Sequence, residues 1–114
     1  MVIPALLAAL FASVWTLGQA TVATNVPPTE VGAAIPADRG LAYSDVAFPT
    51  ADGVTLRGWY VPSTNGAAVV LLHGAGLTRS NVLDHATVLA DHGYGVLAFD
   101  ARGHGGSEGR AMDF

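Results

Sequence analysis

The sequence predicts an α/β fold: a β-hairpin and one right-handed strand–helix–strand unit, preceded by an apolar N-terminal helix. Two runs, at 67–72 and 96–99, are apolar without polar alternation, which is typical of strands buried on both faces of a parallel sheet. Between them, at 80–92, apolar residues recur at helical spacing. A strand, a helix and a strand within about 30 residues form a crossover unit whose strands lie parallel, almost always with a right-handed connection.

The chain begins with an apolar, uncharged run over 2–17 that continues with few polar interruptions to residue 23. Its length lies between that of a signal-peptide core and a bilayer span, and no basic residue precedes it. Small residues such as Gly18 and Ala20 offer cleavage sites. The segment 1–23 is therefore interpreted as an uncleaved membrane anchor, a cleaved signal or a buried helix. The absence of flanking basic residues favours an extracytoplasmic domain, either membrane-anchored or secreted.

Residues 24–42 contain three prolines among small residues and are expected to form an extended linker without a core of its own. The predicted domain covers 43–114. It opens with a hairpin of strands at 44–49 and 54–61, because Asp52-Gly53 is a strong turn signal between them. In the second strand, Trp59 and Tyr60 are interpreted as packing residues.

Two glycine-rich loops, at 73–79 and 100–109, follow the two apolar strands. Open α/β sheets bind ligands at the carboxyl ends of their strands, so these loops are the candidate site. The helix between the strands has Thr78 or Ser80 as a candidate N-cap and Gly93 as its stop.

The first loop is suited to receive negative charge. Gly74 and Gly76 allow a sharp turn that presents backbone N–H groups near a helix N-terminus, either to a phosphate or to a developing oxyanion. For a phosphate, GAGLTR imitates a dinucleotide fingerprint, and Asp100 ends the next strand. However, Arg79 stands where the third glycine should be. A Rossmann-like nucleotide-binding oxidoreductase is thus one alternative.

The other interpretation comes from motifs in a fixed order: FPTADGVTLRGWYVP at 48–62, HGAG at 73–76 and FDARGHGGSEG at 99–109. In these motifs the chain resembles the α/β-hydrolase superfamily over 43–114, closest to serine hydrolases such as monoacylglycerol lipases, lysophospholipases and aminopeptidase-like enzymes. The resemblance implies the N-terminal part of an α/β-hydrolase sheet. It also implies hydrolysis of a small-molecule, lipid or peptide ester or amide by an attacking serine, without a cofactor or metal.

By this resemblance, the backbone N–H of Ala75 is the first oxyanion-hole donor. Gly74 and Gly76 form the turn, His73 shapes it, and His104 shapes the second loop. The second oxyanion donor would come from the residue after the nucleophile.

Ser107 lies in a G-x-S-x-G match, but no apolar strand runs directly into the first glycine, so a turn-forming role is preferred to a nucleophilic one. The resemblance implies that nucleophile, acid and histidine all lie beyond residue 114. The chain is therefore interpreted as an incomplete hydrolase that is inactive alone. The resemblance also implies that the strand at 67–72 pairs with a neighbour on both sides, so an open apolar edge there should aggregate or recruit a partner.

Composition and residue spacing argue against nucleic-acid binding, thiolate chemistry and metal binding. With five Arg, no Lys and a net charge of −4, the chain lacks the basic patch of a nucleic-acid-binding protein. It has no Cys, so thiolate chemistry is excluded. His85 and His92, with Asp84, do not have metal-ligand spacing. A non-catalytic interaction domain tethered to a membrane through 2–23 is the remaining alternative.

Overall fold

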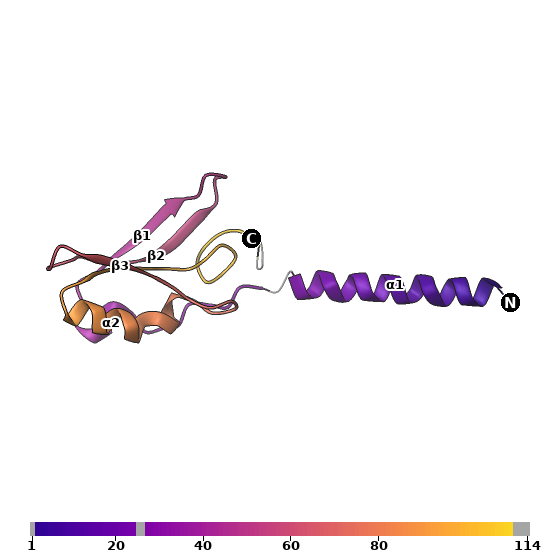
Figure 1. The fold of residues 1–114 in the computed structure, drawn as a ribbon, viewed down its shortest axis with the longest axis horizontal. Helices are drawn as coiled ribbons and strands as arrows, with labels where there is room; N and C mark the ends of the chain where they lie inside the picture. Colours follow the sequence, from indigo (N-terminus) through magenta and orange to yellow (C-terminus); the bar gives the residue numbers. More distant parts are fainter. Residues whose placement is uncertain (1, 25–26, 111–114) are drawn as a thin grey trace.

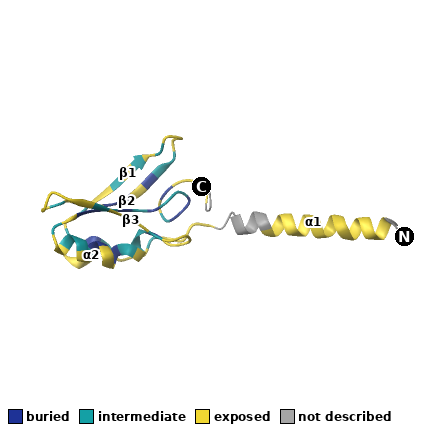
Figure 2. Cartoon of the chain, viewed as in Figure 1, coloured by how far each residue is buried: buried dark blue, intermediate teal, exposed yellow. Residues whose placement is uncertain are grey.

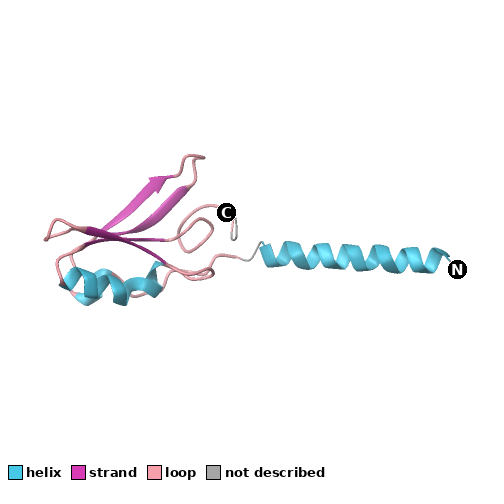
Figure 3. Cartoon of the chain, viewed as in Figure 1, coloured by secondary structure: helices cyan, strands magenta, loops and turns pink. Residues whose placement is uncertain are grey.

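A computed structural model describes residues 2–24 and 27–110 and shows a mixed, four-stranded sheet with helices (Figures 1 and 3). The last four residues of the predicted domain and residues 25–26 of the predicted linker lie outside this description. The elements in chain order are α1 (Val2–Thr24), the 3₁₀ helix η1 (Pro36–Arg39), β1 (Ser44–Pro49), β2 (Thr55–Val61), β3 (Ala68–Leu72), the 3₁₀ helix η2 (Arg79–Val82), α2 (Leu83–Asp91) and β4 (Gly95–Phe99).

The strands lie in the order β1-β2-β4-β3. β1 and β2 form the predicted antiparallel hairpin, with Phe48 opposite Leu56. β3 and β4 are parallel neighbours, as predicted for a crossover unit, and Leu71 lies opposite Ala98. β4 also pairs with β2 in the antiparallel sense. The hairpin is therefore joined to the crossover unit through β4, the last strand along the chain.

The expectation that both strands are buried on both faces is met in part by β4 and is wrong for β3. In β4, Val96 and Ala98 are buried on one face and Leu97 is half-buried on the other. In β3, Val70 is 59% exposed and Leu72 is 61% exposed. There are two reasons: Val70 and Leu72 point to the face of the sheet that α2 does not cover, and β3 is an edge strand with β4 as its one neighbour among the described residues.

α2 covers one face of the sheet (Figure 1). Its Ala86 packs with Val61, Val96 and Ala98 in a small core, around which further apolar residues are half-buried (Figure 2). Trp59 is buried, as expected for a packing residue, whereas its neighbour Tyr60 is 39% exposed. The difference follows from alternation, because successive strand residues point to opposite faces and α2 covers only the face of Trp59.

The predicted helix at 80–92 is two helices. Thr78 is the N-cap of the 3₁₀ helix η2: its hydroxyl accepts a hydrogen bond from the Ser80 amide, and its own amide donates to the Asn81 side chain. α2 then runs to Asp91, and the chain turns at Gly93 with φ +86°. A side chain at Gly93 would also lie 2.8 Å from the Thr64 hydroxyl, so glycine is required there for two reasons.

The segment predicted to be an extended linker is not extended throughout. Pro36 begins η1 and is buried. Arg39 forms an ion pair with Asp84 of α2, with 2.6 Å between the nitrogen and oxygen. Proline favours the first position of a helix because its φ is already helical and its missing N–H has no intrahelical partner there. This segment therefore packs against the domain.

α1 extends away from the sheet, and its large apolar side chains from Ile3 to Leu17 are each more than 60% exposed (Figure 1). Within the described residues, no helix is both long and apolar enough to cross a membrane. The predicted membrane or secretory location remains a prediction.

Candidate functional site

The candidate site consists of the loops at 73–79 and 100–109. They lie together because β3 and β4 are parallel neighbours whose carboxyl ends meet at one edge of the sheet. The sequence predicts the site at these loops, and the structure shows which groups hold the two loops together.

The first loop is a tight turn held by several backbone hydrogen bonds. The Leu77 amide donates to the Gly74 carbonyl oxygen at 3.1 Å. Gly76 has φ +75°, its amide donates to Nε2 of His104 at 3.0 Å, and its carbonyl oxygen accepts from the Thr29 hydroxyl at 2.9 Å. The exposed Ala75 amide, by contrast, has no acceptor within the described residues.

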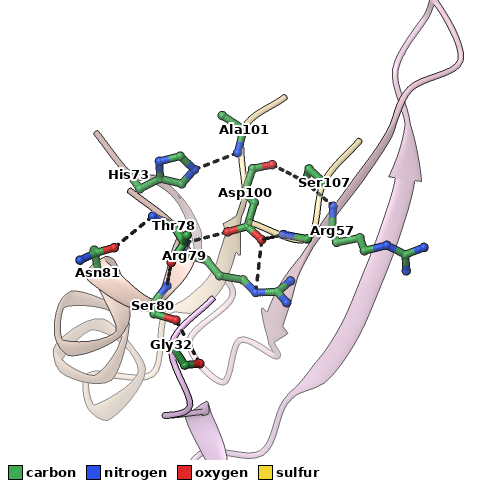
Figure 4. Close-up of polar contacts among 11 residues, drawn as sticks. Gly32, Arg57, His73, Thr78, Arg79, Ser80, Asn81, Asp100, Ala101 and Ser107 are labelled. Atoms are coloured by element: carbon green, nitrogen blue, oxygen red, sulfur yellow. Dashed lines mark hydrogen bonds and ion pairs between the residues drawn. The ribbon is translucent and has the colours of Figure 1, made fainter. Parts of the chain in front are cut away.

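Two histidines connect the loops. His73 follows β3, and its Nε2 accepts from the Ala101 amide of the second loop at 2.9 Å (Figure 4). His104 is buried in the second loop and accepts from the Gly76 amide of the first. The two ring centroids are 5.0 Å apart. The shaping roles predicted for both histidines thus have direct contacts, and each ring acts on the other loop as well as on its own.

Asp100 is fully buried and holds both loops (Figure 4). One carboxylate oxygen accepts from the Arg79 amide at 2.7 Å and the other from the Gly106 amide at 2.9 Å. The Arg79 Nε lies 3.7 Å from the second oxygen, and its guanidinium carbon lies 4.9 Å from the centre of the Trp59 ring. A buried carboxylate is thus balanced by two amides and one cation.

This geometry disfavours the dinucleotide interpretation. A ribose-binding carboxylate must be accessible, whereas both oxygens of Asp100 are engaged and buried. From the sequence, Asp100 is indicated only as the acidic residue that accompanies a dinucleotide-like fingerprint, and its role in holding the two loops together is not predicted. The signal was present: an acidic residue directly after a buried strand needs partners, and glycine-rich loops supply free amides.

Ser107 is held as a structural residue. Its hydroxyl donates to the Asp100 carbonyl oxygen at 2.6 Å and accepts from the Arg57 amide at 2.9 Å, and the residue is buried (Figure 4). It follows a turn rather than a strand, and Gly105 before it has φ +50°. A nucleophilic serine must present its hydroxyl above the sheet, so this geometry favours the predicted turn-forming role.

The second loop is also tied to the hairpin. The Glu108 amide donates to the Thr55 carbonyl oxygen, and the Thr55 amide donates back to the Glu108 carboxylate. Arg102 pairs with Asp52 in the hairpin turn. The hydrogen bond from the Arg102 guanidinium, followed by that from the Thr50 hydroxyl, lowers the pKa of Asp52 from 3.8 to about 2.

The histidines considered as metal ligands lie on α2 and at its end, apart from the two loops. His85 is exposed on α2, and His92 contacts the Val88 carbonyl oxygen through Nδ1 at 2.8 Å.

Comparison with known proteins relates the chain to hydrolases. Residues 63–114 match the family model described as serine aminopeptidase, S33. The chain is 39% identical over 90 residues to an uncharacterized protein of Mycobacterium tuberculosis, a match that covers 76% of this chain and 30% of the relative. It is 44% identical over 69 residues to thiohydrolase aneE of Aspergillus aculeatus, covering 59% of this chain and 22% of that protein.

Among solved structures, the Pyrococcus furiosus esterase Pf2001 superimposes with a TM-score of 0.63 at 38% identity, covering 75% of this chain and 34% of the esterase. The chain spans less than a third of the length of the curated relatives that it matches first.

Proposed function

Because this chain belongs to the α/β-hydrolase superfamily, we propose that it takes part in the hydrolysis of ester or amide bonds by a serine-hydrolase mechanism, with the 73–76 turn as part of the oxyanion hole. Hydrolase activity is supported by the esterase and thiohydrolase among its relatives. The serine mechanism and the oxyanion role are our inference from the motifs and the geometry of the turn.

The observation that carries the proposal is the Ala75 amide. The amides of Gly76 and Leu77 both donate within the protein, whereas Ala75 is an exposed residue whose N–H has no acceptor in the described part of the chain. An oxyanion hole needs a fixed donor that is not engaged in the resting protein, because its hydrogen bond must form as charge develops on the substrate oxygen.

The attacking group is proposed to come from outside this turn and from a residue other than Ser107. The Ser107 hydroxyl donates to one backbone group and accepts from another, as expected for a structural residue. In the superfamily the order is nucleophile, acid and histidine, all after the segment matched here. We therefore propose that the 114 residues alone do not turn over an ester.

A chimera tests the proposal. The part of this chain that superimposes on the Pyrococcus furiosus esterase replaces the corresponding third of that protein, and hydrolysis of a chromogenic short-chain ester is measured. In an active chimera, Ala75→Pro removes the amide hydrogen and should lower kcat about 100-fold. Ala75→Ser keeps the N–H and should retain activity.

Circular dichroism confirms that each variant is folded. Activity of a folded Ala75→Pro chimera within about threefold of the parent would refute the oxyanion role. Ester turnover by the 114-residue chain that disappears in Ser107→Ala would refute the structural role of that serine.

A further inference from the structure

The two peptide units on either side of Ala75 are each held by a different histidine. The unit before it contains the Gly74 carbonyl, which contacts Nδ1 of His73 at 2.7 Å. The unit after it contains the Gly76 amide, which donates to Nε2 of His104 at 3.0 Å. The Ala75 backbone is therefore constrained from both ends by side chains.

The first of these contacts fixes the direction of the Ala75 N–H. A peptide unit is planar, and the structure contains no cis bond among the described residues, so the Gly74 C=O and the Ala75 N–H point in opposite directions within one plane. When Nδ1 of His73 and the Leu77 amide hold the Gly74 oxygen, they also aim the Ala75 hydrogen away from themselves.

The hydrogen bonds also define which nitrogen of each histidine ring carries the hydrogen. Nε2 of His73 accepts from the Ala101 amide, and Nε2 of His104 accepts from the Gly76 amide, so neither Nε2 carries a hydrogen. Nδ1 of His73 lies 2.7 Å from the Gly74 carbonyl oxygen, and Nδ1 of His104 lies 2.9 Å from the Arg102 carbonyl oxygen. Each Nδ1 must therefore carry a hydrogen and donate to that oxygen. Both rings are then neutral Nδ1–H tautomers.

We propose that His73 and His104 form a reciprocal clasp, in which each neutral ring holds a backbone amide of the opposite loop, and that the clasp positions the Ala75 amide as an oxyanion donor. The part concerning the oxyanion rests on the proposed function, whereas the clasp itself does not. Its two halves act together: each ring holds its own loop by Nδ1 and the opposite loop by Nε2, and the rings lie 5.0 Å apart.

Solution NMR of the whole 114-residue chain tests the clasp without any activity assay. Long-range ¹⁵N–¹H correlation spectra should show both His73 and His104 as Nδ1–H tautomers at neutral pH. Finding either ring as the Nε2–H tautomer would overturn the proposal, and this result requires no variant to fold.

Hydrogen exchange and relaxation then test the positioning role. In His104→Leu, exchange of the Gly76 amide should accelerate about five- to tenfold, the loss expected for one hydrogen bond, and the Ala101 amide held by His73 should accelerate with it. The backbone order parameter of Ala75 should fall from about 0.85 toward about 0.6. His104→Gln keeps an acceptor of similar reach and should restore part of the protection.

The matched control is His85→Leu on α2, which should leave all three amides unchanged. An unchanged Ala101 amide in folded His104→Leu would refute the reciprocal arrangement. An unchanged Ala75 order parameter would refute the positioning role. If the clasp is observed and the Ala75→Pro chimera remains active, the clasp stands and the proposed oxyanion role fails.

Discussion

Replacement of Asp100 by alanine should strongly destabilise the domain. The carboxylate is fully buried and accepts hydrogen bonds from the Arg79 and Gly106 amides at 2.7 and 2.9 Å. Hydrogen bonds to charged groups contribute about 1.5–3 kcal/mol each, so their loss alone amounts to about 3–6 kcal/mol. The Arg79 side chain, 14% exposed, would also lose its anionic partner.

Breaking a buried pair by removing one partner typically costs about 3–5 kcal/mol, and we adopt that range for Asp100→Ala. It is a large part of the about 5–15 kcal/mol that stabilises an ordinary domain. Asp100→Asn keeps an acceptor for one of the two amides, but it turns an NH2 group toward the other and loses the charge, so its effect should be smaller than that of Asp100→Ala without being small. Urea unfolding of the full chain, followed by circular dichroism, measures both variants.

Asp91, exposed at the end of α2, provides the matched control, since removing its carboxylate breaks none of the contacts described above. Asp91→Ala should change the free energy of unfolding by about 0.5 kcal/mol or less. If Asp100→Ala costs less than about 1 kcal/mol, the conclusion that this carboxylate holds the two loops together is wrong. Amide exchange gives a local check, because the Arg79 and Gly106 amides should lose protection first.

Three further predictions concern the second loop and the sheet edge. Gly105→Ala should lower the thermal unfolding temperature, because Gly105 has φ +50° and an added Cβ would lie 2.4 Å from the Asp100 carboxyl carbon. The Asp52–Arg102 pair should stabilise the hairpin turn above pH 3.8 and lose this effect as the pH falls toward about 2, because the Asp52 pKa is lowered by folding; a carboxyl titration by NMR measures it. Val70→Lys on the exposed edge strand should reduce self-association, measured by light scattering, without changing the circular dichroism spectrum.

Each of the three has an outcome that contradicts it. Gly53→Ala is the control for the first, because Gly53 also has positive φ but open space around it, and an equal effect of the two variants would exclude the steric clash. An Asp52 titration unchanged by Arg102→Gln would show that the pair is not formed in solution. Equal scattering from Val70→Lys and the parent chain would show that the open edge does not drive association.

The individual elements could be predicted from the sequence because their signals are local. Asp52-Gly53 between alternating strands defined the hairpin, and Gly93 defined the end of α2. The loops at 73–79 and 100–109 could be located because the parallel pairing of β3 and β4 follows from the crossover pattern. These inferences need only neighbours along the chain.

The tertiary structure alone determined which elements have neighbours. The runs that became β3 and β4 look alike in sequence, yet one is an exposed edge and the other is central, because burial depends on how many strands pair beside each and on which face α2 covers. Likewise, nothing local pairs the His104 ring with the Gly76 amide or aims the Asp100 carboxylate at the amides of both loops. Such contacts join residues far apart in sequence, and they form only after the sheet has brought the two loops together.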